Sequence, residues 1–310
     1  MKPLVSICIP AYQQTYFLKM CIDSLLKQTY DNFEVIITDD SKDDSVRKLI
    51  ESYNNPLLQY YHNSPSLGNP ANWNSAMERA KGKYIKIMHH DDYFLKEDSL
   101  KKMVSEAEKN KADFVFCNTE VWHQNDNTRR IAKPNAVQLQ RMQKDIYFLF
   151  FKNVIGAPSA TLFLNNKKYF DARFKWLVDV EFYIRYLKEG KFAYINEPLI
   201  CTVHEAPGQV TQSVKGTRDV ELKENILLFS LLLPHLESTK NYELFFEYFF
   251  RDFDIKKIEE LEALTDLNED LKKIFEKIIK QKDKNVTFKK LIWRLYNSRY
   301  NKRYFKIEQF

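Results

Sequence analysis

The sequence predicts an α/β fold with a mostly parallel central sheet, followed by a helical C-terminal region. Strand-like and helix-like segments alternate through the first half of the chain, which is typical of a parallel sheet covered by helices. The 310 residues are 44% hydrophobic, which allows a sizeable core. From residue 217 onward the pattern is helical and charged. We therefore expect one α/β domain over residues 1–215 and a helical region over residues 216–310.

The predicted elements follow one another at short intervals. Runs of β-branched residues indicate strands, and apolar residues on one helical face indicate helices, as over 16–28, where Thr15 is the candidate N-cap. Strands are expected over 5–10, 33–38, 58–62, 84–88, 112–118, 192–195 and 199–204. Helices are expected over 16–28, 45–53, 72–80, 97–109 and 178–188, whereas 119–177 is less regular.

Composition and motif content disfavour several classes of protein. The six glycines are not spaced as a phosphate-binding loop or a dinucleotide-binding fingerprint, which argues against an NTPase or an oxidoreductase. The four cysteines are far apart in the sequence and are expected to be buried thiols in a reducing compartment. We find neither a signal peptide nor an apolar run of about 18 residues, so the expected location is cytoplasmic.

Two acidic pairs lie at the ends of predicted strands. Asp39-Asp40 follows the strand over 33–38, and Asp91-Asp92 follows the strand over 84–88. In parallel sheets ligands bind beyond the carboxyl ends of the strands. Mg²⁺ and Mn²⁺ favour oxygen ligands, and one or two carboxylates with substrate phosphates are a common set. Asp91-Asp92 fits that demand, and the alternative interpretation is a polar turn at a strand end.

Five stretches, in this order, resemble the inverting family-2 glycosyltransferases of GT-A fold. They are VSICIPAY (5–12), SLLKQTY (24–30), FEVIITDDS (33–41), AKGKYIKIMHHDDYF (80–94) and LVDVEFYIRYLKEG (177–190). The resemblance implies transfer of a sugar from a nucleotide diphosphate, expected to be UDP-linked, with inversion at the anomeric carbon. The acceptor would be a hydroxyl of a saccharide or a lipid-linked saccharide, in bacterial surface polysaccharide or oligosaccharide biosynthesis.

The resemblance also implies a nucleotide-binding set. Pro10, Ala11 and Tyr12 would form its first loop, with Tyr12 against the base. Asp40 would hydrogen-bond the base, and Asp91 would contact the ribose.

The metal site and the catalytic base are implied in the same way. Asp91 and Asp92 would bind a metal–diphosphate, and His204 matches a histidine near the metal, so these three residues are the expected ligands of Mn²⁺ or Mg²⁺. Asp179 matches the catalytic base, which takes the proton of the acceptor hydroxyl. Asp179 could instead be only an N-cap. Glu181 is the alternative base, or else part of a solvated helix face.

Two departures from the family pattern keep other functions open. His89 stands where an aspartate is common, and Val178 replaces an acidic residue before the base. A second hypothesis is therefore a homologue that binds sugar nucleotide or glycan without transferring it. A third is a sugar-1-phosphate nucleotidyltransferase, which is disfavoured because the loop over 10–15 has neither glycine nor a basic residue. Residues 156–159 precede a strand and are expected to border the acceptor site.

The C-terminal tail carries most of the positive charge. Residues 280–310 hold ten Lys or Arg and two acidic residues, against a net charge of +6 for the whole chain. Basic and aromatic residues alternate there, as in helices that lie on membrane surfaces, which predicts a peripheral position on the inner face of the membrane. The alternative is a helix packed on the catalytic domain. A nucleic-acid partner is not expected, because the rest of the chain is slightly acidic and carries no such motif.

Overall fold

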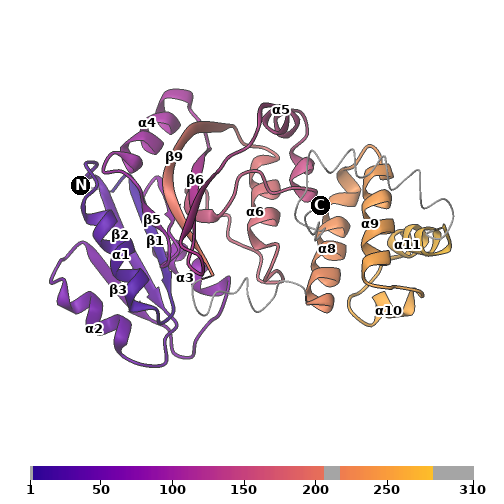
Figure 1. The fold of residues 1–310 in the computed structure, drawn as a ribbon, viewed down its shortest axis with the longest axis horizontal. Coiled ribbons are helices and arrows are strands. Elements are labelled where there is room, and N and C mark those ends of the chain that lie inside the picture. The colour runs from indigo at the N-terminus through magenta and orange to yellow at the C-terminus, as the bar shows by residue number, and fades with distance from the viewer. Residues whose placement is uncertain (1–2, 206–216, 282–310) are drawn as a thin grey trace. The chain divides into compact units, whose positions relative to one another are not determined.

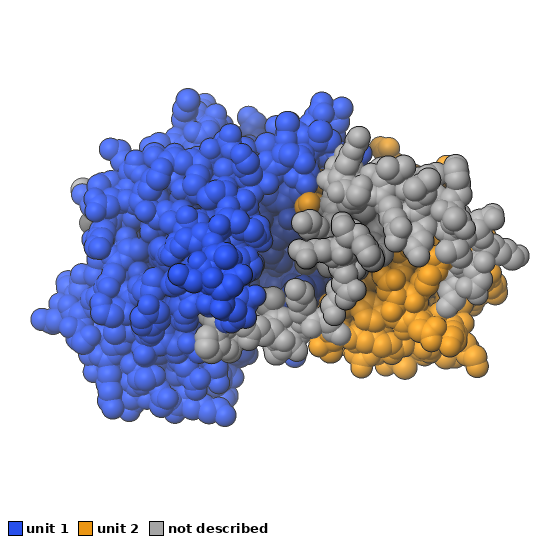
Figure 2. Space-filling model, in the orientation of Figure 1, with its two compact units in different colours: residues 1–146, 153–212 blue, residues 147–152, 213–310 orange. Residues whose placement is uncertain are grey.

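The computed structural model describes residues 3–205 and 217–281. The chain forms two compact units, residues 1–146 with 153–212, and residues 147–152 with 213–310 (Figure 2). The expected boundary near residue 215 and the basic aromatic tail lie outside the described residues.

A nine-stranded sheet forms the centre of the first unit (Figure 1). Its order is β3-β2-β1-β4-β8-β6-β9-β5, and β7 pairs with β6. The strands β1 to β4 pair in parallel, as do β6 and β9, whereas β8, β5 and β7 are joined by antiparallel pairs. The strands are β1 Val5–Ala11, β2 Phe33–Asp39, β3 Leu58–His62, β4 Tyr84–Ile87, β5 Tyr93–Phe94, β6 Phe114–His123, β7 Thr128–Ala132, β8 Thr161–Leu164 and β9 Phe192–His204.

Helices cover both faces of this sheet. Ile7 and Ile9 of β1 pack in one apolar cluster with α1 (Thr15–Leu26), α2 (Ser45–Ser52) and α4 (Ser99–Asn110). Successive side chains of a strand point to opposite faces, so these three helices share one face. On the other face α3 (Ala71–Arg79) contacts β1 and β2, and Phe182 of α6 (Val178–Leu187) packs on Phe163 of β8. The predicted α/β architecture is confirmed.

Several local predictions need correction. Thr15 is the first residue of α1, and its N-cap is Gln14, which has a positive φ of 51° and no side-chain cap. The two strands expected over 192–195 and 199–204 are one strand, β9, with a register irregularity where Asn118 faces Pro198. The region 119–177 also holds the rest of β6, all of β7 and β8, the helix α5 (Ala136–Lys144) and the short turns η1 (Ile146–Phe150) and η2 (Pro158–Ala160).

The second unit is helical and rich in aromatic contacts. Phe246 packs against Phe229 at 5.2 Å and against Phe275 at 5.0 Å between ring centroids. Phe150 belongs to the same cluster, because its ring lies 5.0 Å from that of Tyr242. The segment 147–152 is thus part of this unit's core, although it lies between two stretches of the first unit in sequence. The elements are α8 Arg218–Leu232, η3 Leu233–His235, α9 Lys240–Asp252, α10 Glu259–Glu262 and α11 Glu269–Gln281.

Among the described residues, no helix combines the length and the apolar character that crossing a bilayer would require.

Candidate active site

Two segments meet at one edge of the sheet: the loop of residues 10–12 at the end of β1, and the acidic turn of residues 88–92 after β4. Strands β1, β2 and β4 are parallel, so their carboxyl ends lie at this edge. The backbone N–H of Asp40 donates to the carbonyl of Ala11 at 3.0 Å. The ring nitrogen Nδ1 of His90 lies 3.2 Å from the carbonyl oxygen of Pro10. Pro10, Ala11, Asp40 and the turn after β4 are therefore neighbours at this edge.

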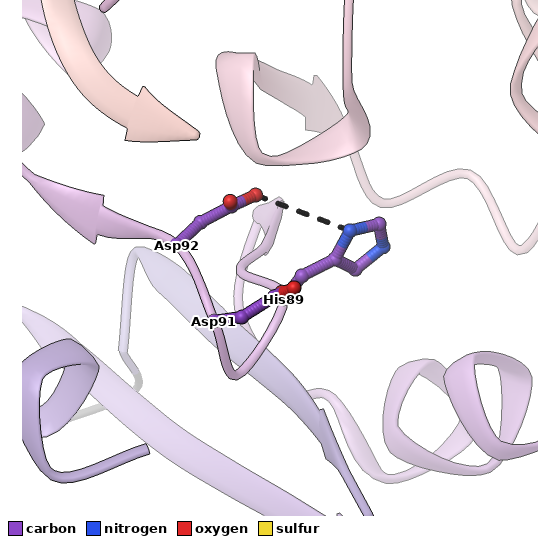
Figure 3. Close-up of side chains that lie close together, drawn as sticks. All are labelled: His89, Asp91 and Asp92. Carbon is purple, nitrogen blue, oxygen red and sulfur yellow. Dashed lines mark ion pairs between the residues drawn. The ribbon is translucent and has the colours of Figure 1, made fainter. Parts of the chain in front are cut away.

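The turn after β4 brings three potential metal ligands together (Figure 3). His89, Asp91 and Asp92 each offer one ligand atom, and these atoms all lie within 4.8 Å of one another. The turn is closed by the N–H of Asp92, which donates to the carbonyl of His89 at 3.0 Å. Two carboxylates and an imidazole form a donor set that suits a divalent cation. The residues present therefore fit the expected metal.

Residues distant in sequence hold this turn in place. The backbone N–H of Val203 in β9 donates to Oδ1 of Asp92 at 3.1 Å. The N–H of His89 donates to the hydroxyl oxygen of Ser159 at 3.0 Å, and the Ser159 side chain also hydrogen-bonds Asp92. The ammonium group of Lys86, which is fully buried, donates to the carbonyl oxygens of Ser159 and Ile87. Ser159 thus connects a buried lysine with two of the potential ligands.

Burial favours the uncharged forms of Asp92 and His89. Burial raises the pKa of the Asp92 carboxyl well above its usual range, and the charge of Asp91 acts in the same direction. Burial lowers the pKa of the His89 ring, which keeps it neutral near pH 7 with a lone pair available. A divalent cation at this place would favour the ionised form of Asp92, because opposite charges stabilise a carboxylate.

Tyr12 and Asp40 directly follow β1 and β2, at the same edge of the sheet. The Asp40 carboxylate accepts hydrogen bonds from the side chain of Asn63 at 2.8 Å and from the N–H groups of Leu67 and Gly68 at 3.1 and 2.7 Å. A carboxylate has about four acceptor positions, so these three bonds fix the group and leave room for one more donor. Tyr12 is 41% exposed, which leaves its ring accessible to a ligand.

Asp179 lies in the first turn of α6 and is not its N-cap. The helix begins at Val178, and Leu177 occupies the N-cap position. The side-chain amide of Asn153 donates to Oδ2 of Asp179 at 2.6 Å, and Oδ1 accepts from the N–H of Val180 at 2.9 Å. The carboxylate is therefore oriented by its neighbours, and the N-cap interpretation does not describe its position.

The structure also gives the surroundings of Glu181 and His204. Glu181 is 4% exposed and forms an ion pair with Arg185, so the solvated-face interpretation is wrong. His204 ends β9 directly after Val203, and its ring packs against His123 with centroids 5.4 Å apart. Within the described residues, the group of three ligands does not include His204. Burial lowers the pKa of His204, which leaves its ring neutral near pH 7.

A row of rings connects the acidic turn to α6. The Trp73 ring lies 4.6 Å from the His89 ring and 5.1 Å from the Phe170 ring. Phe170 stacks on Phe182 at 4.2 Å, and Phe182 lies one helical turn beyond Asp179. Packed aromatic contacts of this kind are close and rigid. They fix α6, and with it Asp179, relative to the turn that carries Asp91 and Asp92.

Sequence reasoning missed three supporting residues. Lys86 carried a usable signal, because a lysine inside an otherwise apolar strand is seldom buried without a partner. Asn153 also carried one, since an asparagine three residues before a glycine is typical of a side-chain-stabilised turn, and here its Oδ1 accepts from the N–H of Gly156 at 2.9 Å. Ser159 belongs to the segment expected to border an acceptor, and its hydrogen bond with the backbone N–H of His89 was not expected.

The sheet order and the acidic turn beyond a central strand define a glycosyltransferase of GT-A fold. A family model described as "Glycosyl transferase family 2" matches residues 6–174, more than half of the chain. The chain therefore belongs to glycosyl transferase family 2.

Relatives of this chain carry glycosyltransferase names. It is 26% identical over 220 residues to the UDP-Glc:alpha-D-GlcNAc-diphosphoundecaprenol beta-1,3-glucosyltransferase WfgD of Escherichia coli, covering 71% of this chain and 83% of that protein. It is 26% identical over 210 residues to the uncharacterized glycosyltransferase RT0329 of Rickettsia typhi, covering 66% of this chain. The match spans 65% of the Rickettsia protein's length, which is less than two thirds.

Solved structures support the fold. TarS of S. aureus (residues 1–349) in complex with UDP-GlcNAc superposes with a TM-score of 0.60 at 18% identity, over 91% of this chain and 81% of that one. The mannosyltransferase PcManGT of Pyrobaculum calidifontis in complex with GDP-Man and Mn²⁺ gives a TM-score of 0.52 at 14% identity, over 96% of this chain and 80% of that one. The GT-A fold expected from the resemblance is confirmed.

Proposed function

We propose that this chain is a metal-dependent inverting glycosyltransferase that uses a UDP-sugar donor. The observation that carries the proposal is the placement of an oriented carboxylate, Asp179, on a helix fixed by ring contacts to the turn of His89, Asp91 and Asp92. The loop of Pro10, Ala11 and Tyr12, with Asp40, would hold the nucleotide beside that turn. The UDP-GlcNAc bound to TarS and the UDP-Glc in the name of WfgD favour a UDP-linked donor.

Two groups of residues would share the reaction: Asp179 would act on the acceptor, and the acidic turn would act on the diphosphate. Asp179 would accept the proton of the acceptor hydroxyl as that oxygen forms a bond to the anomeric carbon. In the same displacement the bond between that carbon and the diphosphate oxygen breaks, and the electron pair leaves with the diphosphate. Asp91 and Asp92 would hold the metal, with His204 nearby, and the metal would neutralise charge on the departing diphosphate. Mn²⁺ or Mg²⁺ would serve, and the Mn²⁺ bound to PcManGT supports this choice.

The acceptor that we propose is a saccharide or lipid-linked saccharide hydroxyl in surface polysaccharide synthesis. WfgD, by its name, transfers glucose to a diphosphoundecaprenol-linked sugar. An acceptor of that kind would bring the protein to the cytoplasmic surface of a membrane. The basic aromatic tail that would suit such a surface lies outside the described residues.

The test is turnover and binding of UDP, GDP and dTDP sugars, with and without Mn²⁺, for wild type and Asp179→Asn. The base assignment predicts unchanged donor affinity in the variant and a rate lower by about 10²–10⁴-fold. Asp219→Asn is a matched control, since Asp219 also lies in the first turn of a helix, and it should turn over like wild type.

Three other outcomes point elsewhere. If no donor binds, the nucleotide role of Asp40 and Asp91 is wrong. If donors bind while wild type and variant are equally inert with a broad acceptor panel, the protein is a sugar-nucleotide-binding homologue. Exchange that depends on pyrophosphate would instead indicate a nucleotidyltransferase.

A further inference from the structure

The acidic turn contains an imidazole where an oxygen ligand is the common choice for Mg²⁺. His89 points its Nδ1 toward Asp92, with 4.0 Å between Nδ1 and Oδ2 (Figure 3). This distance is too long for a hydrogen bond. It does fit two ligands on opposite sides of a cation. Each metal–ligand bond is about 2.0–2.2 Å long, so the two ligand atoms would lie about 4 Å apart.

The other nitrogen of the His89 ring is left without a partner. Its Nε2 is buried and makes no hydrogen bond within the part of the chain that the structure describes. Leaving a buried polar atom without a hydrogen bond is unfavourable, so such an atom usually has a role beyond packing. If Nε2 carries the proton of the neutral ring, the lone pair lies on Nδ1, the nitrogen that faces Asp92.

The surroundings hold this ring in a defined orientation. Trp73 packs against it at 4.6 Å, and the backbone N–H of His89 is bonded to Ser159 at 3.0 Å. The neighbouring His90 is turned away, toward the carbonyl of Pro10. His89 alone of the two histidines therefore faces the carboxylates.

We propose that His89 is a direct ligand of the divalent metal and that it makes this site favour Mn²⁺ and later first-row metals over Mg²⁺. The inference rests on the proposed function, because it concerns the same metal site. Imidazole nitrogen suits transition metals, whereas Mg²⁺ prefers an all-oxygen environment. Exchanging His89 for aspartate should therefore weaken the preference for Mn²⁺ over Mg²⁺ without removing the site.

The first experiment detects the nitrogen directly. The full-length protein is prepared with ¹⁵N-labelled histidine, loaded with Mn²⁺ and unlabelled UDP, and examined by pulsed electron paramagnetic resonance. The proposal expects a ¹⁵N coupling in the wild-type spectrum and its loss in His89→Asp. Histidine labelling separates the protein nitrogen from the nucleotide nitrogens. The wild-type measurement does not depend on how the variant folds.

The second experiment measures metal choice by titrating Mn²⁺ and Mg²⁺ into the UDP-bound protein. We expect the ratio of the Mg²⁺ to the Mn²⁺ dissociation constant to fall by about tenfold or more in His89→Asp. His235→Ala, which removes an exposed histidine from the second unit, should leave the ratio unchanged.

The outcomes separate this inference from the function on which it rests. Bound Mn²⁺ without a histidine coupling, or with a coupling that persists in His89→Asp, would overturn the assignment of His89 and leave a metal-dependent transferase intact. An unchanged selectivity ratio would overturn the claim on metal preference. Failure of any divalent cation to bind would overturn both the inference and the metal dependence.

Discussion

Ser159 joins a distant part of the chain to the turn of His89, Asp91 and Asp92. Its hydroxyl group bonds the backbone of His89 and the carboxyl group of Asp92, and its carbonyl accepts from Lys86. Groups that orient metal ligands in this way commonly affect metal affinity as strongly as some ligands do. Ser159 is fully buried, so its replacement does not change the solvent-exposed surface of the protein.

Ser159→Ala is expected to weaken Mn²⁺ binding in the presence of UDP by about 10–100-fold. Isothermal titration of Mn²⁺ measures this change. Ser99→Ala is the matched control, because Ser99 is also fully buried and its hydroxyl donates to the carbonyl of Leu199 at 2.9 Å. Equal losses of affinity in the two variants would show that Ser159 acts only on stability.

Lys86 gives a prediction on pH. Burial lowers its pKa from 10.5 to about 8. Below pH 8 both the folded and the unfolded chain hold the proton, and burial of the charge destabilises the fold. Between pH 8 and 10.5 the folded lysine releases its proton while the unfolded one keeps it. The wild type therefore gains stability over this range, by up to about 3 kcal/mol.

The measurement compares the free energy of unfolding of wild type and Lys86→Met from pH 7 to 10. Methionine has no titrating group, so the difference between the two proteins isolates Lys86. We expect the difference to move in favour of wild type as the pH rises. A difference that stays constant would mean that the pKa of Lys86 is the same in the folded and unfolded states.

The predictable part of the site was the part that is local in sequence. Asp91 and Asp92 could be found because they lie in the turn that follows a strand, and the carboxyl ends of neighbouring parallel strands lie at one edge of the sheet. The bond between His89 and Ser159 joins residues 70 positions apart, and that between Asn153 and Asp179 joins residues 26 apart. Such pairs depend on which elements become neighbours, which periodicity does not reveal.

At the scale of elements, the start of β4 depends on close contact with β1. A Cβ at Gly82 would lie 2.6 Å from the backbone nitrogen of Ser6 and 2.8 Å from the backbone carbon of Val5. Real Cβ atoms do not approach backbone atoms this closely. The N–H of Gly82 also donates to the Ser6 hydroxyl at 2.8 Å. Glycine is therefore required here for space, so that β4 can enter the sheet beside β1.

Gly82→Ala is expected to lower the free energy of unfolding by about 1–3 kcal/mol, because the two strands must separate slightly. Urea denaturation followed by circular dichroism measures the loss. Lys81→Ala is the control, since that side chain is exposed and its N–H, which bonds Glu34, is kept. Similar stabilities for the two variants would contradict the close-contact explanation.

Elements were predicted well where the pattern repeats, and poorly where a strand is interrupted. The alternation over residues 5–118 gave the strands β1 to β4 and the helices between them. The sequence predicted two strands in place of β9, because Pro198 has no N–H to donate to a neighbouring strand. The register between β6 and β9 shifts where Asn118 faces Pro198. The sequence pattern placed Glu181 on a solvated face of α6. This helix is instead buried on nearly all sides, and Arg185 neutralises the Glu181 carboxylate.

At the scale of the whole molecule, the second unit takes part of its core from an inserted segment. Phe150 is 2% exposed and lies 5.0 Å from Tyr242 and 5.1 Å from Phe245, measured between ring centroids. The boundary expected from composition alone could not include this segment, because residues 147–152 are short and lie within the span assigned to the first domain.

Phe150→Ala is therefore expected to destabilise the second unit by about 3–5 kcal/mol, as large-to-small changes in a core do. Limited proteolysis should then cleave α8 to α11 faster while the sheet of the first unit stays protected. Phe151→Ala serves as the control, because Phe151 is only half-buried and should cost less. Faster cleavage within β1 to β4 instead would assign Phe150 to the first unit.

The position of residues 147–152 restricts how the second unit can be exchanged between related genes. A single crossover in the gene near residue 212 would deliver helices α8 to α11 without the phenylalanines at 150 and 151, or would leave those two residues with foreign helices. A new C-terminal unit could be acquired intact only by two exchanges, or by one exchange followed by adaptation of the inserted segment. The helical unit is thus expected to have been inherited together with the first unit, and chimeric proteins built at one junction should require compensating changes at residues 147–152.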